Sequence, residues 1–250
     1  MAISKRHRGF SLTEVLLAVG TLAVGLTFVG GTFLTGIYLS SVSTERTTGT
    51  AVAKEAFAKI RLYGVDVTDP NLAADRQTSF ETLQHSLAGL TMVDPNEFAY
   101  PSTRTVFSDK QYFWSALCRL TSTDPDVRLV QVTVFVSRKM PGADNFVGGA
   151  LWPVPVEVPV APVTGAGNEN KLQITDADQQ TYIGAGDQIV DNQTGRIYRV
   201  LDEDPADLDV VILDVPWQGG TSDTSVWVVP PALSGGRRPG IGVYQRFIRF

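Results

Sequence analysis

The chain has 250 residues, of which 21 are basic and 26 acidic, so its formal net charge is −5. Because nucleic-acid phosphates are bound by basic surfaces, this balance argues against nucleic acid as a general partner, and none is expected. The single cysteine, Cys118, excludes an intrachain disulfide. It lies in a strand-like segment, which predicts a small buried apolar role; an interchain bridge or a reactive thiol is the alternative.

An uncharged run from Val15 to Thr44 dominates the start of the chain. It exceeds the ~20 residues that cross a bilayer as a helix, and the basic residues Lys5, Arg6 and Arg8 precede it. The positive-inside rule then keeps the first residues cytoplasmic and exports the rest. A cleaved secretory signal would have a shorter apolar core before a small-residue cleavage site. A plain signal anchor fits the length but gives no reason for the acid Glu14.

The stretch "RGFSLTEVLLAV" resembles the prepilin signature of type IV pilins and of the pseudopilins of type II secretion. The basic leader, the glycine, the phenylalanine, the glutamate and the apolar run all occur in the register of that family. The resemblance implies that a prepilin peptidase cuts between Gly9 and Phe10 and then N-methylates Phe10. Residues 1–9 are then a leader peptide. The match covers only the N-terminal part of the chain.

Glu14 is the residue that this resemblance explains. A helix N-terminus has unpaired N–H groups and a partial positive charge, and cleavage would add the amine of Phe10. A carboxylate in hydrocarbon is costly unless it is paired. The resemblance implies that Glu14 meets the amine of a neighbouring subunit, in a filament-assembly salt bridge that sets the axial register. The alternative is a glutamate that complements the dipole of its own helix.

Residues 10–39 are expected to form the transmembrane and filament-core half of a long helix, which continues to Tyr63 and stops at Gly64. The pair Gly30 and Gly31 predicts a weak point, because glycine costs ~1 kcal/mol relative to alanine in a helix interior. Related filaments carry a proline near that depth, where their helix loosens on assembly. Close packing against another helix is the alternative role for the two glycines.

Residues 40–150 are expected to form a pilin-like head, made of the second half of the helix and an antiparallel sheet. The segment "VRLVQVTVFVSR" alternates between apolar and polar residues, which predicts a half-buried strand with Gln131, Thr133 and Ser137 facing away from the core. Residues 72–90 look weakly helical. The predicted fold class is α+β: a long N-terminal transmembrane helix packed on an antiparallel β-sheet, as in the pilin fold, with an additional C-terminal β-rich module.

Residues 151–170 contain the proline-rich tract "LWPVPVEVPVAPV", which we expect to be an extended linker or an edge and not a central strand. Residues 171–250 follow as a C-terminal β module. Their short strand patterns, separated by turn residues, predict a small sandwich or barrel. The final segment, "GVYQRFIRF", could instead return to the main sheet.

Candidate chemical sites are few. His85 is the only histidine outside the leader, it has no motif around it, and we expect it at the surface. A lone cysteine, a lone histidine and the lack of a P-loop or GxGxxG motif predict no enzyme and no cofactor. The acidic segment "LDEDPADLD" is a candidate calcium site, because calcium prefers oxygen ligands, and a solvated turn is the alternative. The candidate calcium ligands are Asp202, Asp204, Asp207 and Asp209.

The sequence predicts a structural subunit of a type IV pilus or a type II secretion pseudopilus, and a minor one because of its large head and added module. We expect it to cross the bacterial inner membrane once, with a cytoplasmic N-terminus and an extracytoplasmic head, before it joins a filament in the periplasm or at the cell surface. The resemblance implies four partners: other pilin or pseudopilin subunits, the prepilin peptidase, an inner-membrane assembly platform and membrane lipid. The alternative function is a signal-anchored envelope module that recognises a glycan or a protein.

Overall fold

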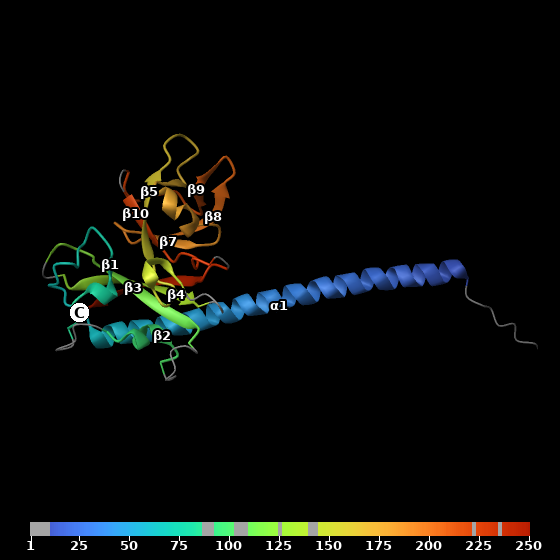
Figure 1. Ribbon diagram of the computed structural model, residues 1–250, viewed down its shortest axis with the longest axis horizontal. Helices are drawn as coiled ribbons and strands as arrows, with labels where there is room; N and C mark the ends of the chain where they lie inside the picture. Colours follow the sequence, from blue (N-terminus) through green and yellow to red (C-terminus); the bar gives the residue numbers. More distant parts are fainter. Residues whose placement is uncertain are drawn as a thin grey trace, which may run out of the picture. The chain divides into compact units, whose positions relative to one another are not determined.

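The computed structural model describes residues 11–86, 93–102, 110–124, 127–139, 145–221, 224–234 and 237–250. The chain divides into two compact units, Met1–Thr47 and Thr48–Phe250. The main elements are a long N-terminal helix, a five-stranded antiparallel sheet and a closed barrel (Figure 1).

Helix α1 runs from Leu12 to Tyr63 and has 52 residues. It ends where predicted, because Gly64 has a φ of 71° and its N–H donates to the carbonyl of Ile60 at 2.9 Å. The last turns of the helix bury one apolar face. The buried residues are Gly49, Val52, Ala53, Ala56, Phe57 and Ile60.

Five strands form the first sheet in the order β1-β3-β4-β11, with β2 also paired to β3. Their bounds are Thr78–Ser79 for β1, Ala99–Tyr100 for β2, Tyr112–Leu120 for β3, Leu129–Arg138 for β4 and Gly240–Arg249 for β11. Each pair is antiparallel, and β4 pairs with β3 on one side and with β11 on the other.

One face of this sheet shares a hydrophobic core with the end of α1. Val130, Val132, Val134 and Val136 alternate along β4, as the sequence predicts, and all four lie in the same buried cluster as Phe57 of α1. The Arg246 guanidinium of β11 also stacks over the Phe57 ring, with its carbon 4.7 Å from the ring centroid. This core therefore joins the end of the helix to the sheet.

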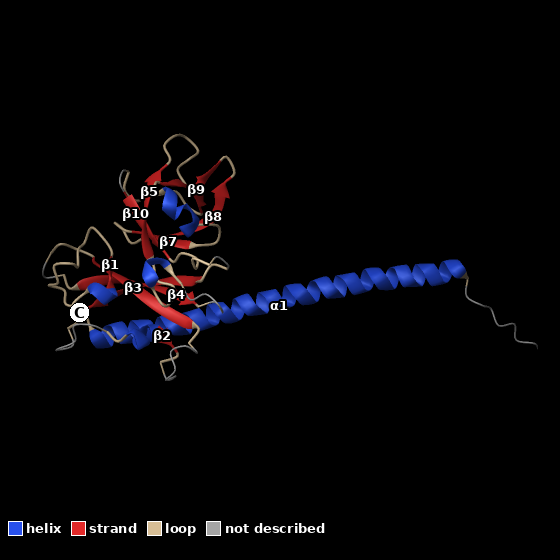
Figure 2. Ribbon diagram, viewed as in Figure 1, coloured by secondary structure: helices blue, strands red, loops and turns tan. Residues whose placement is uncertain are grey.

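Six strands close into a barrel, in the order β10-β5-β6-β9-β8-β7, and they lie together in Figure 2. Their bounds are Val156–Pro162 for β5, Lys171–Ile174 for β6, Gln188–Asp191 for β7, Ile197–Asp204 for β8, Asp207–Leu213 for β9 and Thr224–Val228 for β10. The barrel is filled by its own apolar core, which includes Val158, Leu172, Tyr198 and Val226. Short 3₁₀ helices occupy Phe80–Thr82, Pro95–Phe98, Val147–Gly149 and Ala177–Tyr182.

The proline-rich tract differs from the linker expected over 151–170, because strand β5 of the barrel lies within it. Strand β5 pairs with β10 over 156–160 and with β6 over 160–162. Pro159 therefore lies before the pairing with β6 begins, and Pro162 lies after the pairing with β10 has ended. Proline has no N–H to donate, and it is tolerated at these two positions because each has a paired strand on one side only.

The closing strand β11 returns to the first sheet, so the module expected over 171–250 has different bounds. In the sequence, the barrel segment lies between β4 and β11, which pair with each other in that sheet. Of the weak helix expected over 72–90, the described residues form β1 and a 3₁₀ turn instead. Residues 87–92 of that segment, and the strand-like "RTVFS" at 104–108, lie outside the described residues.

The second face of the sheet is buried, although its polar residues predict exposure. Gln131, Thr133 and Ser137 are at most 4% exposed. The turn between β7 and β8 lies near Gln131 and Thr133, since Gln245 of β11 donates to the hydroxyl of Thr133 at 3.0 Å and to the carbonyl of Gly195 at 2.7 Å. The hydroxyl of Ser137 donates instead to the carbonyl of Pro153 at 3.0 Å. The polar face of β4 therefore receives the barrel, and hydrogen bonds replace the expected water.

Substitution of Gly195 should test how tightly this turn is seated. Its φ is 70°, and an added Cβ would lie 2.5 Å from Nε2 of Gln77 and 2.7 Å from Oε1 of Gln131. The control Gly148 has a φ of 72° with no atom within 4 Å of an added Cβ. Gly148→Ala should lower the free energy of unfolding by roughly 1–2 kcal/mol through backbone strain alone. Gly195→Ala should lower it by a further ~1–3 kcal/mol through crowding, measured by urea denaturation. Equal losses of unfolding free energy in the two variants would contradict tight packing of the β7–β8 turn on the sheet.

Candidate functional site

The start of α1 forms a capping box from residues inside the prepilin-like stretch. The hydroxyl of Ser11 accepts from the N–H of Thr13 at 3.3 Å, and the Glu14 carboxylate accepts from the N–H of Ser11 at 3.0 Å. Two N–H groups that the helix leaves unpaired are satisfied in this way. The expected cleavage and methylation positions, Gly9 and Phe10, lie outside the described residues.

Glu14 therefore interacts with its own helix start, which is the alternative role that the sequence leaves open. The contact uses oxygen Oε2 of an exposed side chain. A carboxylate has two oxygens and about four lone-pair sites, so this contact is compatible with a second partner. The arrangement makes Glu14 a helix cap.

The first part of α1 is long and apolar enough to cross a membrane or to act as a signal sequence. Its large apolar side chains are exposed, among them Leu17, Phe28 and Leu34. Threonine hydroxyls in this part of the helix donate to carbonyls of the preceding turn at 2.9–3.0 Å. The donors are Thr21, Thr27, Thr32 and Thr35. The backbone of the helix therefore satisfies these hydroxyls, and they need no hydrogen-bond partner from an apolar surrounding.

Gly30 and Gly31 lie inside the helix, which continues through both residues. No atom lies within 4 Å of a Cβ added at either position. Gly31 lies in a shallow apolar groove along this face of the helix, with Phe28 and Leu39 beside it. Small residues of this kind allow another helix to approach closely. The predicted loosening at this pair stays a prediction.

The acidic segment forms the β8–β9 hairpin of the barrel. The carboxylate of Asp204 is held by the ammonium of Lys171 at 2.6 Å and by the N–H of Ala206 at 3.0 Å, and both contacts lower its pKa. Asp202 accepts from the N–H of Glu203, and Asp207 from the N–H of Asp209. Among the described residues, no group of three or more His, Cys, Asp or Glu side chains is arranged to hold a metal ion. The calcium site stays a prediction, and these contacts do not gather its four candidate ligands around one point.

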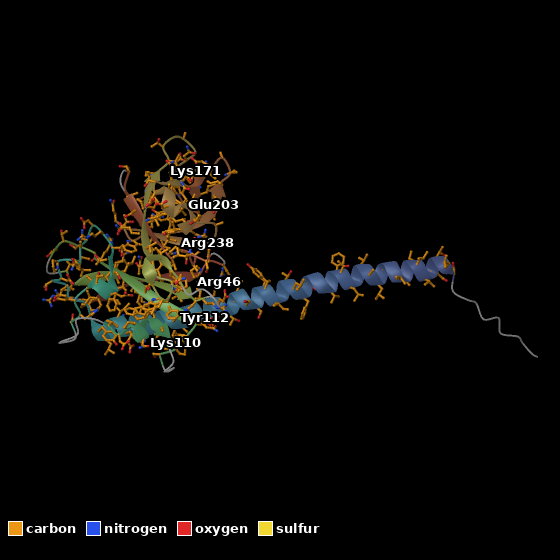
Figure 3. The ribbon with its side chains drawn as sticks, viewed as in Figure 1. Arg46, Lys110, Tyr112, Lys171, Glu203 and Arg238 are labelled. Carbon is orange, nitrogen blue, oxygen red and sulfur yellow. The ribbon has the colours of Figure 1, made fainter. Side chains whose placement is uncertain are left out.

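An ion pair that sequence reasoning missed fastens the segment that leaves the barrel. The Arg238 guanidinium donates to the carboxylate of Asp187 at 2.5 Å and to the carbonyl of Tyr182 at 3.1 Å. Figure 3 labels Arg238 together with Glu203 and Lys171. Burial raises the pKa of Asp187 to about 6; the Arg238 guanidinium opposes this rise and the Glu203 carboxylate adds to it. Arg237 and Arg238 follow two glycines in the sequence, and no local pattern there points to a buried carboxylate partner.

The remaining chemical candidates have structural roles. His85 is buried, contrary to its expected place at the surface, because its ring packs on Phe80 with centroids 4.7 Å apart. Its Nδ1 lies 3.2 Å from the carbonyl of Gly64, just after α1. Cys118 is free and fully buried in the core, as predicted, and burial raises the pKa of its thiol.

No family model matches the chain, and neither a curated protein nor a solved structure matches it.

The pH dependence of stability should report on Asp187. Its folded pKa of about 6 lies above its ordinary value of 3.8, so the folded chain binds a proton there more readily than the unfolded chain does. Stability from this group is fully present below about pH 4 and is lost as the pH rises through about 6. Asp187→Asn should flatten that decline, measured by urea denaturation across pH followed by tryptophan fluorescence. Arg238→Gln should move the decline to higher pH; a profile unchanged in both variants would contradict the assignment.

Proposed function

We propose that this chain is a pilin-like structural subunit, which a prepilin peptidase processes and which enters a helical filament of a type IV pilus or type II secretion pseudopilus. The observation that carries the proposal is the register at the start of the helix. Glu14 stands four residues after Phe10, at the first turn of α1 and directly before the uncharged run. A membrane anchor alone does not require an acid at that depth.

The rest of the structure supports this proposal. A pilin-like subunit needs an apolar helix that ends on an antiparallel sheet, and α1 shares a core with β3, β4 and β11. The barrel inserted between β4 and β11 enlarges the head beyond what such a sheet needs. The enlarged head favours a minor subunit, since a subunit repeated along a whole filament is more often compact.

The proposed mechanism is mechanical. The apolar helix holds the subunit in the inner membrane, and an assembly platform lifts it into the filament. Cleavage after Gly9 exposes the amine of Phe10, and Glu14 of the next subunit pairs with that amine as the helices pack. Loss of one partner from this membrane-embedded pair would be costly, because an unpaired carboxylate or ammonium is poorly solvated in hydrocarbon.

A signal-anchored envelope module is the second candidate. The observation that favours it is the closed barrel, which has its own core and could recognise a glycan or a protein. Under that function Glu14 serves only as a helix cap. The two candidates therefore differ in the fate of residues 1–9 and in the role of the Glu14 charge.

The mass of the mature chain tests the processing step. In cells with a prepilin peptidase, the purified protein should start at Phe10 and carry one methyl group on its amine. The same chain from cells without the peptidase should keep residues 1–9 and serves as the control. An N-terminus that stays intact in the presence of the peptidase would contradict the proposal and leave the signal-anchored module.

Two variants of Glu14 separate helix capping from charge pairing. Glutamine at this position keeps the capping box, because Glu and Gln both accept from the N-cap N–H, but it removes the charge. We expect Glu14→Gln and Glu14→Ala each to reduce filament incorporation by at least ~10-fold, since both leave the amine unpaired. Membrane insertion should be unchanged. Incorporation is measured by comparing the subunit in sheared filaments with the subunit in membranes; normal incorporation of Glu14→Gln would leave capping as the role.

A further inference from the structure

A buried ion pair holds the segment through which the chain returns from the barrel to the first sheet. We call residues 237–239, directly before β11, the return segment. Arg238 of this segment donates to the Asp187 carboxylate at 2.5 Å and to the carbonyl of Tyr182 at 3.1 Å. The side chain of Asp187 is only 7% exposed. The contact between the return segment and the barrel therefore depends on the charge of this carboxylate.

Gly184 leaves the space that the Arg238 guanidinium occupies. A Cβ added at Gly184 would collide with this guanidinium and would lie 3.0 Å from Oε1 of Glu203. A carboxylate oxygen of Glu203 therefore also lies near the arginine, and Figure 3 labels both residues. The N–H of Gly184 donates to the Asp187 carboxylate at 3.0 Å. The barrel thus forms a seat for the arginine side chain, and Asp187 lies in it.

The groups that face Asp187 determine how its charge responds to pH. Burial has the largest effect and raises the pKa of Asp187 to about 6, and the Glu203 carboxylate adds to this rise. The Arg238 guanidinium and the Gly184 N–H oppose it, because both favour the ionised form. Asp187 also lines a cleft between the barrel and the strands β4 and β11. Glycines, apolar side chains and Gln188 form the rest of that lining and bring no further charge.

Asp187 is tied to the barrel by its backbone, independently of the return segment. Its N–H donates to the carbonyl of Gly184 at 3.1 Å, and its carbonyl accepts from the N–H of Val200 at 2.9 Å. When Arg238 leaves, the carboxylate keeps Glu203 as a neighbour and loses the cation that favours ionisation. Release of Arg238 therefore raises the pKa of Asp187. By linkage, protonation of Asp187 must favour the release of Arg238.

The return segment fixes the start of β11 against its neighbours. The carbonyl of Pro239 accepts from the N–H of Arg138 in β4 at 2.9 Å. Four residues further on, the N–H of Val243 donates to Oε1 of Gln188 in β7 at 2.8 Å. Gln188 and residues 240–243 line the same cleft between the barrel and the sheet. A loose return segment would therefore loosen this edge of the cleft, while the β7–β8 turn stays on the sheet.

We propose that Asp187 and Arg238 form a pH-sensitive latch, in which the ionised carboxylate holds the return segment and its protonation releases the start of β11. The change falls around pH 6. The stability of the whole fold responds in the opposite direction, because the neutral form of this buried carboxyl favours the folded chain. Low pH thus stabilises the fold and loosens one connection within it. The latch lies in the head and does not depend on cleavage after Gly9.

Hydrogen exchange of the full chain in lipid nanodiscs tests the latch. Exchange is measured at about pH 7.5 and about pH 5, on peptides that contain Arg138 or residues 240–244, and is divided by the rate of an unfolded chain at the same pH. We expect the corrected exchange to be ~5–10-fold faster at the lower pH, since each unit of pKa gained on release multiplies the open population by up to tenfold. Peptides from β6 and β9 serve as the internal control and should keep their protection.

Three variants assign the response to the ion pair. Asp187→Asn and Arg238→Gln each remove one partner, so both should exchange fast at the two pH values. The control Arg237→Gln removes the same charge from the neighbouring residue and should keep the response of the unaltered chain.

Exchange in the unaltered chain that is equal at the two pH values, or slower at the lower one, would overturn the proposal even if a variant does not fold. A folded Asp187→Asn chain that still responds to pH would overturn it as well. None of these results bears on the N-terminal mass, so this inference and the proposed function fail separately.

Discussion

The seating of the β7–β8 turn on the sheet is the constraint on which the rest of the head depends. Arg119 reaches from β3 to Gln131 of β4 at 2.5 Å and to the turn carbonyl of Gln193. Gln245 ties the same turn to β11. Buried polar groups of this kind stabilise one arrangement, because each would be left unpaired in any other. The sheet thus has α1 residues on one face and the barrel on the other.

The insertion of the barrel between two neighbouring strands strengthens this constraint. The inserted segment is connected to the first sheet at both of its ends, because β4 precedes it in the chain and β11 follows it. The ion pair of Arg238 with Asp187 holds the outgoing segment against the barrel. A module attached at two points and seated by hydrogen bonds moves less than one on a single linker.

The sequence predicted the elements whose signals are local. The end of α1 at Gly64, the alternation along β4 and a small β module all follow from spacing and turn residues. It could not predict what covers Gln131 and Thr133, because burial of a polar face depends on a partner more than fifty residues away. The strand within the prolines was missed for the same reason. At the candidate site, "SLTE" permits the capping box, whereas the Asp187 partner of Arg238 carries no local signal.

The threonines of the apolar segment have a consequence under the proposed function, in which the helix passes from lipid to a protein surrounding. Their hydroxyls already donate to the backbone one turn earlier. A move of this segment from acyl chains to the side of another protein helix would therefore break none of these threonine hydrogen bonds. Under the proposed function, these hydroxyls therefore oppose neither the stay of the helix in lipid nor its transfer into a filament.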